Sequence, residues 1–222
     1  MYHSLRIFAA AFAAVVVGIH AFAGTTYYVS ANGDGTSPTN GFPTGYSNIA
    51  SAVSAATTDG DKIIIEASDT PYALAAAQSV SHAITIHGTD RDRTVIQPAS
   101  GKSIQIFNIT AAGAEISTLT LQGGSVANGY GGNVEMTGDS VISNCVLRGG
   151  TAQNGSAISF KIGLVTHCII TNNTSTGGEV PQQGGAVMFN TVAAGTKAIL
   201  DHCLVAFNRG LSPRDAPRGE AG

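Results

Sequence analysis

The sequence predicts an all-β solenoid, in which short strands stack in successive coils around one shared core. Three observations predict it. A six-residue pattern recurs through the second half of the chain, with no helical periodicity inside the repeats. The 28 glycines are typical of many tight turns. Hydrophobic residues make up 43% of the chain and charged residues only 11%, a composition that excludes disorder.

The recurring pattern is apolar, polar, polar, Leu or Cys, any residue, apolar, and then a turn rich in Gly or Asn. Its four copies are Ile116–Leu121, Ile142–Leu147, Val165–Ile170 and Leu200–Val205. The first and fourth positions are alike, although alternation would place them on opposite faces of a strand, so we infer a bend at the polar pair. We expect the first, fourth and sixth positions to point into the core. Segments 125–132, 151–156 and 174–185 are interpreted as loops of variable length between coils.

Two other repeat or β architectures are less consistent with this pattern. Leucine-rich repeats keep a more constant spacing, and a β-sandwich does not explain why the same polar-polar-Cys corner recurs. A repeat unit of this kind buries its apolar face only by stacking on its neighbours. The pattern therefore favours a parallel β-helix over residues 61–208.

The N-terminal segment, residues 24–60, is predicted to contain a strand, a loop and a short amphipathic helix near residues 47–57. Ile49, Ala52 and Val53 lie on one helical stripe, Ser47 is the expected N-cap, and Asp59–Gly60 ends the helix. Such a helix lies just ahead of the first coil and is well placed to cover the open end of the core.

Equivalent residues of successive coils stack about 4.8 Å apart. Stacking predicts one column inside the core, formed by Leu119, Cys145, Cys168 and Cys203. Stacked side chains place Cβ atoms farther apart than a disulfide prefers, so we interpret the cysteines as free, buried hydrophobic residues. The alternatives are a metal site or a nucleophile, but the spacing typical of cysteine metal sites is missing.

The residues just before this column form a predicted ladder of polar side chains at a corner of the coil: Thr118, Asn144, His167 and His202. We interpret them as turn residues that bond to neighbouring backbone. The alternative is a zinc site at the two histidines, although two imidazoles fall short of the three protein ligands that catalytic zinc usually has.

Several segments carry a resemblance to a known family. They resemble the start of secreted right-handed parallel β-helix proteins of the pectate-lyase-like superfamily: "TYYVSANGDGTSP" (26–38), "GDKIII" (60–65) and "AITIHGTDRDRTVI" (83–96). "GGAV" (184–187) resembles, more weakly, a repeat of polymorphic outer membrane proteins and adhesins. The resemblance extends from Thr25 to about Asn208 and implies a right-handed parallel β-helix of about five to six coils.

The same resemblance implies two classes of function. Enzymes of the superfamily are mostly polysaccharide lyases, with an Arg or Lys base beside carboxylate-bound calcium, and hydrolases with paired Asp residues. The charged residues of these coils do not recur at one strand position. We therefore favour a non-catalytic protein that presents a surface for adhesion or glycan binding, with a polysaccharide lyase or glycoside hydrolase as the alternative. No cofactor is expected, except that Asp34 in "NGDG" is a candidate calcium ligand beside the simpler interpretation as a turn.

Both ends of the chain carry further expectations. Residues 1–23 have a basic flank, a short apolar core and an Ala-Phe-Ala end, which predicts a signal peptide and a location that is secreted, or at the bacterial cell surface or outer membrane. Removal of this signal peptide leaves ten basic and fourteen acidic residues, so the mature chain has a net charge of −4. This negative charge argues against nucleic acid as a partner. We expect no transmembrane helix in the mature chain, and a polysaccharide or cell-surface protein as partner.

Residues 209–222 are predicted to be an irregular tail. We interpret this tail as a truncation of a longer protein, and we expect self-association through an uncapped last coil.

Overall fold

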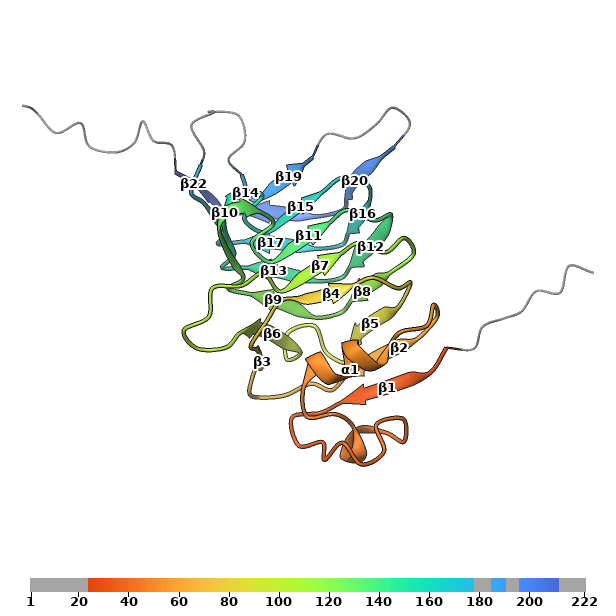
Figure 1. Cartoon of the computed structure of the whole chain (residues 1–222). Helices are drawn as coiled ribbons and strands as arrows, with labels where there is room; N and C mark the ends of the chain where they lie inside the picture. Colours follow the sequence, from red (N-terminus) through yellow and green to blue (C-terminus); the bar gives the residue numbers. More distant parts are fainter. Residues whose placement is uncertain (1–23, 178–184, 191–195, 212–222) are drawn as a thin grey trace, which may run out of the picture.

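The computed structural model of this chain describes residues 24–177, 185–190 and 196–211. These residues form a right-handed parallel β-helix of about five turns. The coils follow one another from β1 at the lower end of the molecule to β20 and β22 at the upper end (Figure 1). Because the cross-coil pairing is parallel throughout, each sheet is built from strands of successive coils. The fold class predicted from the repeat is confirmed.

One sheet, which we call sheet A, takes a strand from every coil. Its members are β1 (Thr26–Val29), β2 (Lys62–Ile65), β5 (Thr85–Gly88), β8 (Glu115–Ser117), β12 (Ser140–Ser143), β16 (Gly163–Thr166) and β20 (Ala198–Asp201). One apolar residue near the centre of each strand faces inward, and those of β2 to β16 are in register and fully buried: Ile63, Ile86, Ile116, Ile142 and Val165. The column they form is one wall of the core.

Two further sheets complete the walls of the solenoid. Sheet B contains β3 (Tyr72–Leu74), β6 (Val95–Pro98), β9 (Thr120–Gln122), β13 (Val146–Arg148), β17 (Ile169–Thr171) and β21 (Leu204–Ala206). Sheet C contains β4 (Gln78–Val80), β7 (Phe107–Ile109), β11 (Val134–Met136), β15 (Ile158–Phe160) and β19 (Val187–Phe189). The largest buried side chains, Phe107 and Phe160, enter the core from sheet C.

A fourth sheet, sheet D, corrects two of the sequence predictions. It contains β10 (Ser125–Tyr130), β14 (Thr151–Asn154), β18 (Thr174–Ser175) and β22 (Arg209–Gly210). The first three lie in segments that we interpreted as loops, and the fourth lies where we expected the irregular tail to begin. Backbone pairing between adjacent coils makes these segments strands, although they lack the apolar alternation that identifies a strand in a sequence. The rest of the expected tail, residues 212–222, lies outside the described residues, as does the expected signal peptide.

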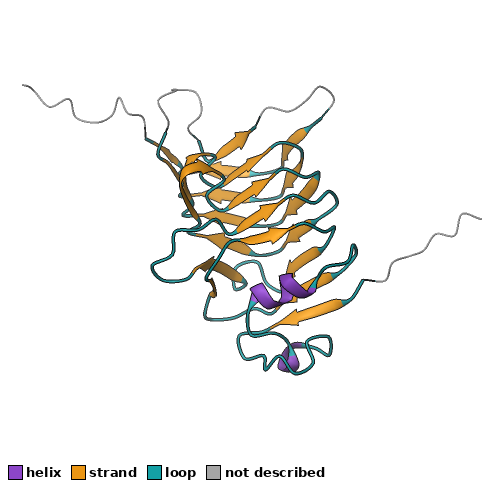
Figure 2. Cartoon of the chain, viewed as in Figure 1, coloured by secondary structure: helices purple, strands orange, loops and turns teal. Residues whose placement is uncertain are grey.

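The helical residues lie in the N-terminal segment, in η1 (Phe42–Thr44) and α1 (Ile49–Ala55) (Figure 2). The N-cap of α1 is Asn48, whose side chain accepts a hydrogen bond from the Ser51 amide at 2.9 Å, so the prediction of Ser47 was wrong by one residue. Ile49 and Ala52 are buried, and α1 contacts β1 to β4, where it covers the first coil. Among the described residues, α1 included, no helix has the length and apolarity needed to cross a membrane.

The last coil is less buried than the coils before it. Val205 is in register with Ile170, which is fully buried, yet Val205 is 45% exposed. Leu200 and Cys203 are only partly buried. Leu200 and Cys203 pack against the core from this coil, and the three positions are less enclosed than their counterparts because no described coil stacks beyond it.

Candidate functional site

The predicted polar ladder lies at the corner between sheets A and B. Thr118, Asn144, His167 and His202 follow β8, β12, β16 and β20, with φ angles of 58°, 49°, 53° and 46°. All four are in the left-handed region, which Asn and His enter more readily than most residues and β-branched Thr enters rarely. The amides of the first three donate to the carbonyls of Ser143, Thr166 and Asp201 in the next coil, at 3.1–3.2 Å. The ladder is therefore part of the corner backbone itself.

The two histidines of the ladder stack face to face. Their ring centroids are 5.1 Å apart and the ring planes differ by 4°. His202 Nδ1 lies 2.8 Å from Asp201 Oδ2, and His167 Nδ1 lies 2.8 Å from Thr166 Oγ1. Thr166 Oγ1 in turn donates to Asp201 Oδ2 over a longer distance of 3.5 Å. The hydrogen bond from His202 lowers the pKa of Asp201, so this carboxylate stays ionised. It contacts the His202 ring directly and the His167 ring through the Thr166 hydroxyl.

The predicted cysteine column lies one residue further along each coil. Leu119, Cys145 and Cys168 are buried, Cys203 is half-buried, and all three cysteines are free thiols. The Cys203 sulfur accepts a hydrogen bond from the Cys168 amide at 3.4 Å. The hydrogen bond to Cys145 and burial raise the pKa of Cys168, and burial raises that of Cys203. Since the thiolate is the form that attacks or binds metal, the raised pKa values disfavour reactivity at Cys168 and Cys203.

Asp34, the candidate calcium ligand, lies in an exposed turn. Its Oδ1 accepts hydrogen bonds from the Thr36 amide at 2.9 Å and the Thr36 hydroxyl at 2.6 Å. The hydrogen bond from the Thr36 side chain is the main cause of the lowered pKa of Asp34. Within the described parts of the chain, no three His, Cys, Asp or Glu side chains gather into a metal-binding group. These contacts support the interpretation of Asp34 as a turn residue.

A polar cleft of about 350 Å³, which we call the β2–β3 cleft, lies beside the segment that joins those two strands. Its lining residues are Ser30, Ala31, Asn32, Glu66, Ala67, Ser68, Asp69, Thr70 and Arg93. Arg93 Nη2 donates to Asp69 Oδ1 at 2.8 Å, and this hydrogen bond raises the pKa of Arg93. The Glu66 carbonyl accepts a hydrogen bond from the Tyr72 hydroxyl at 2.8 Å, and burial raises the pKa of Tyr72 to about 12.

The sequence analysis did not find this cleft. Ser30 and Asn32 precede the helix, residues 66–70 follow β2, and Arg93 comes from the next coil. The only local signal was the run of alternating charge in residues 90–93, which is also typical of a solvated loop.

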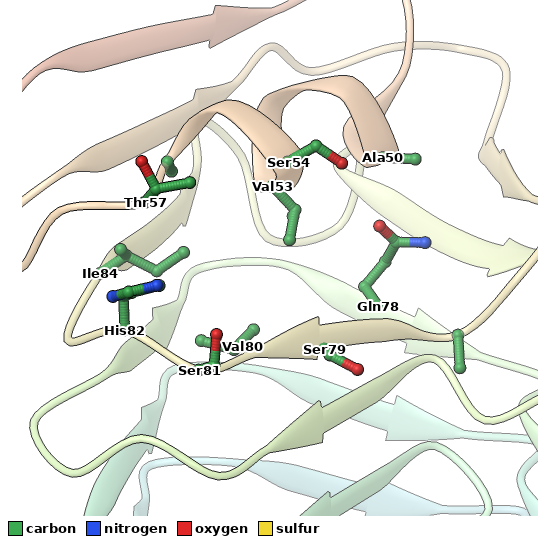
Figure 3. A pocket seen from close by; sticks show the side chains of 12 residues that line it. Ala50, Val53, Ser54, Thr57, Gln78, Ser79, Val80, Ser81, His82 and Ile84 are labelled. Atoms are coloured by element: carbon green, nitrogen blue, oxygen red, sulfur yellow. The ribbon is translucent and has the colours of Figure 1, made fainter.

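A second cleft, of about 450 Å³, lies between α1 and β4. Figure 3 shows Val53, Ser54 and Thr57 on the helix side and Gln78, Ser79 and Val80 on the strand side. Strands stack about 4.8 Å apart, whereas a helix with its side chains is about 10 Å wide, so α1 cannot continue the stack below β4 without a gap. His82 at its edge lies 3.8 Å from Asp59, and no carboxylate lines this cleft among the described residues.

The fold and these sites define the chain as a parallel β-solenoid with polar clefts at its N-terminal coils. No protein family, curated protein or solved structure matches it in the comparisons with known proteins.

Proposed function

We propose that this protein is a non-catalytic extracellular β-helix that presents a surface for binding glycans. The observation that carries the proposal is the β2–β3 cleft, where an Arg93–Asp69 ion pair lies among hydroxyl and amide side chains. Membership of the pectate-lyase-like superfamily is part of the proposal and is supported by the parallel β-helix fold.

The chemistry of the cleft suits sugar hydroxyls. Each hydroxyl of a sugar both donates and accepts, and the cleft offers donors on Arg93, acceptors on Asp69 and Glu66, and both on Asn32. The guanidinium and the carboxylates are planar and charged, so they can form directed, charge-assisted hydrogen bonds with neighbouring hydroxyls.

The alternative function is a polysaccharide lyase or glycoside hydrolase of the same superfamily. The observation in its favour is that two acidic residues, Glu66 and Asp69, line one cleft, as general acid–base catalysis requires. The Arg93–Asp69 pair weighs against Arg93 as the base of a lyase, because the hydrogen bond to Asp69 raises the pKa of Arg93 and so disfavours the deprotonated form that a base needs. We therefore keep non-catalytic glycan binding as the proposed function.

Calorimetry with purified chain and neutral or acidic polysaccharides, among them pectin, alginate and chondroitin, tests binding directly. We expect Arg93→Gln to weaken binding roughly tenfold, because it removes about 1.4 kcal/mol of charge-assisted hydrogen bonding. Arg91→Gln is the matched control, since the Arg91 side chain pairs with Asp92 and does not line the cleft. Equal losses in both variants would contradict the assignment to this cleft, and steady release of unsaturated products, with or without calcium, would overturn the non-catalytic proposal.

Location and partners are part of the same proposal. Residues 1–23 are proposed as the signal peptide of a protein that is secreted or carried at a bacterial cell surface. We also propose self-association through the last coil, supported by the exposure of Leu204 (59%) and Phe207 (85%).

A further inference from the structure

The hydrogen bonds around the stacked histidines fix which ring nitrogen carries the proton. Asp201 is ionised and can only accept, so His202 Nδ1 is the donor of their 2.8 Å contact. The Thr166 hydroxyl donates to the same carboxylate, which leaves its lone pairs to accept from His167 Nδ1. Both neutral rings therefore carry the proton on Nδ1 and keep the lone pair on Nε2. Neither Nε2 has a hydrogen-bond partner among the described residues.

This arrangement is the one that metal-binding histidines use. A histidine that binds a metal through one nitrogen usually donates its other N–H to a carboxylate or another acceptor, which orients the ring and raises its basicity. Here one carboxylate orients two imidazoles, directly for His202 and through Thr166 for His167. Both rings are exposed and project from the same corner in successive coils.

We infer that His167 and His202 form a binding site for one divalent transition-metal ion of the Zn²⁺ class, oriented by Asp201 and Thr166. Imidazole nitrogen is a preferred ligand of Zn²⁺, Ni²⁺ and Cu²⁺, and not of Ca²⁺ or Mg²⁺. The chain supplies two ligands, since no larger metal-binding group occurs in the described residues, and water completes the coordination sphere.

The geometry requires the rings to leave the parallel stack, because each Nε2 lone pair lies in its ring plane and the two planes, which now differ by 4°, must converge on the ion. Zn–N bonds of about 2.0–2.1 Å in a tetrahedral site place the two nitrogens about 3.3 Å apart. The centroids are 5.1 Å apart in the stack. Exposed side chains can make this adjustment, and the ion then joins the corner of the last coil to the corner before it.

Zinc titration of the full chain, without an added histidine tag, tests the inference. We expect one Zn²⁺ per chain by calorimetry, with coordination-induced shifts of ¹⁵Nε2 at two histidines in NMR spectra. His167→Asn and His202→Asn should each remove the site, and Asn is tolerated at this corner because Asn144 occupies it in an earlier coil. Asp201→Asn should weaken affinity roughly tenfold, as loss of a carboxylate that orients a ligand typically does.

Three controls separate this site from other zinc binding. His82→Gln removes the isolated imidazole at the α1–β4 cleft and should leave the zinc affinity unchanged. Cys203→Ala removes the half-buried thiol and should also leave it unchanged. Zinc should raise the melting temperature of the wild type but not of the His167→Asn/His202→Asn double variant. Zinc binding that survives in the double variant, or the absence of any binding in the wild type, would overturn the inference.

Discussion

At the residue scale, the corner between sheets A and B depends on four residues with positive φ. Thr118 is the least suited of them, because a β-branched side chain at φ 58° crowds its own backbone. The left-handed conformation costs an ordinary residue about 1–2 kcal/mol, and Asn less. The stacked coils hold Thr118 there through the hydrogen bond from its amide to the Ser143 carbonyl at 3.2 Å.

We predict that Thr118→Asn stabilises the protein by about 1 kcal/mol, because Asn relieves this conformational cost. For a chain of this size, that corresponds to a rise of about 2–4 °C in melting temperature, measured by circular dichroism. The matched control is Thr171→Asn on β17, where the backbone does not have positive φ and the change should be neutral or destabilising. A loss of stability in Thr118→Asn would mean that the contacts of the threonine outweigh its strain.

At the element scale, the turn between sheets B and D is held by three asparagines, of which Asn133 and Asn173 are buried and Asn208 is half-buried. The amides of Gly124, Gly150 and Asn173 are each bound by the side-chain oxygen of an asparagine, at 2.8–3.0 Å. Asn173 also donates to the carbonyls of Leu147 and Thr171, both at 3.0 Å. Gly150 leaves room for this network, since a Cβ there would lie 2.7 Å from Asn133 Nδ2. The buried polar groups of this turn are tolerated because they are paired.

Removing one of these asparagines should therefore be costly. We predict that Asn173→Ala destabilises the protein by about 3 kcal/mol, because it removes the acceptor of the buried Gly150 amide and the side-chain donor to the Leu147 and Thr171 carbonyls. Urea denaturation measures the change. Asn108→Ala, at a half-buried outward position on β7, is the control and should alter stability by no more than about 0.5 kcal/mol. Comparable effects of the two substitutions would show that the network contributes little.

At the scale of the whole molecule, the two ends of the solenoid differ. The N-terminal end is covered by α1, whereas the last coils expose most of the large apolar side chains on the described surface: Phe189, Ile199, Leu204, Val205 and Phe207. The strands β19 to β22 are the last of their sheets, so each has an edge without a described partner strand. Exposed apolar groups beside free strand edges favour association between chains.

We predict that the protein self-associates in a concentration-dependent manner through this end. Sedimentation velocity over a range of concentrations should show species larger than the monomer. Leu204→Thr combined with Phe207→Asn should shift the distribution toward monomer, because the two changes remove the most exposed apolar side chains of the last coil. Tyr130→Ser, an exposed aromatic on β10, should leave the distribution unchanged. A wild type that is monomeric at every concentration would rule out the proposed association.

The sequence by itself determined the solenoid, the positions of the corners and the column of core residues. A left-handed corner accepts few residue types, and a shared core requires the same residue character in every coil, so both leave a repeated pattern in the chain. Tertiary structure alone decided sheet D, the β2–β3 cleft and the contacts among Thr166, His167, Asp201 and His202. Their strands pair and their side chains meet across coils that lie 22 to 35 residues apart in sequence, as between Gln153 and Ser175 or between Thr166 and Asp201. Since such contacts depend on which edges the stacking brings together, they impose no periodic pattern of residue types.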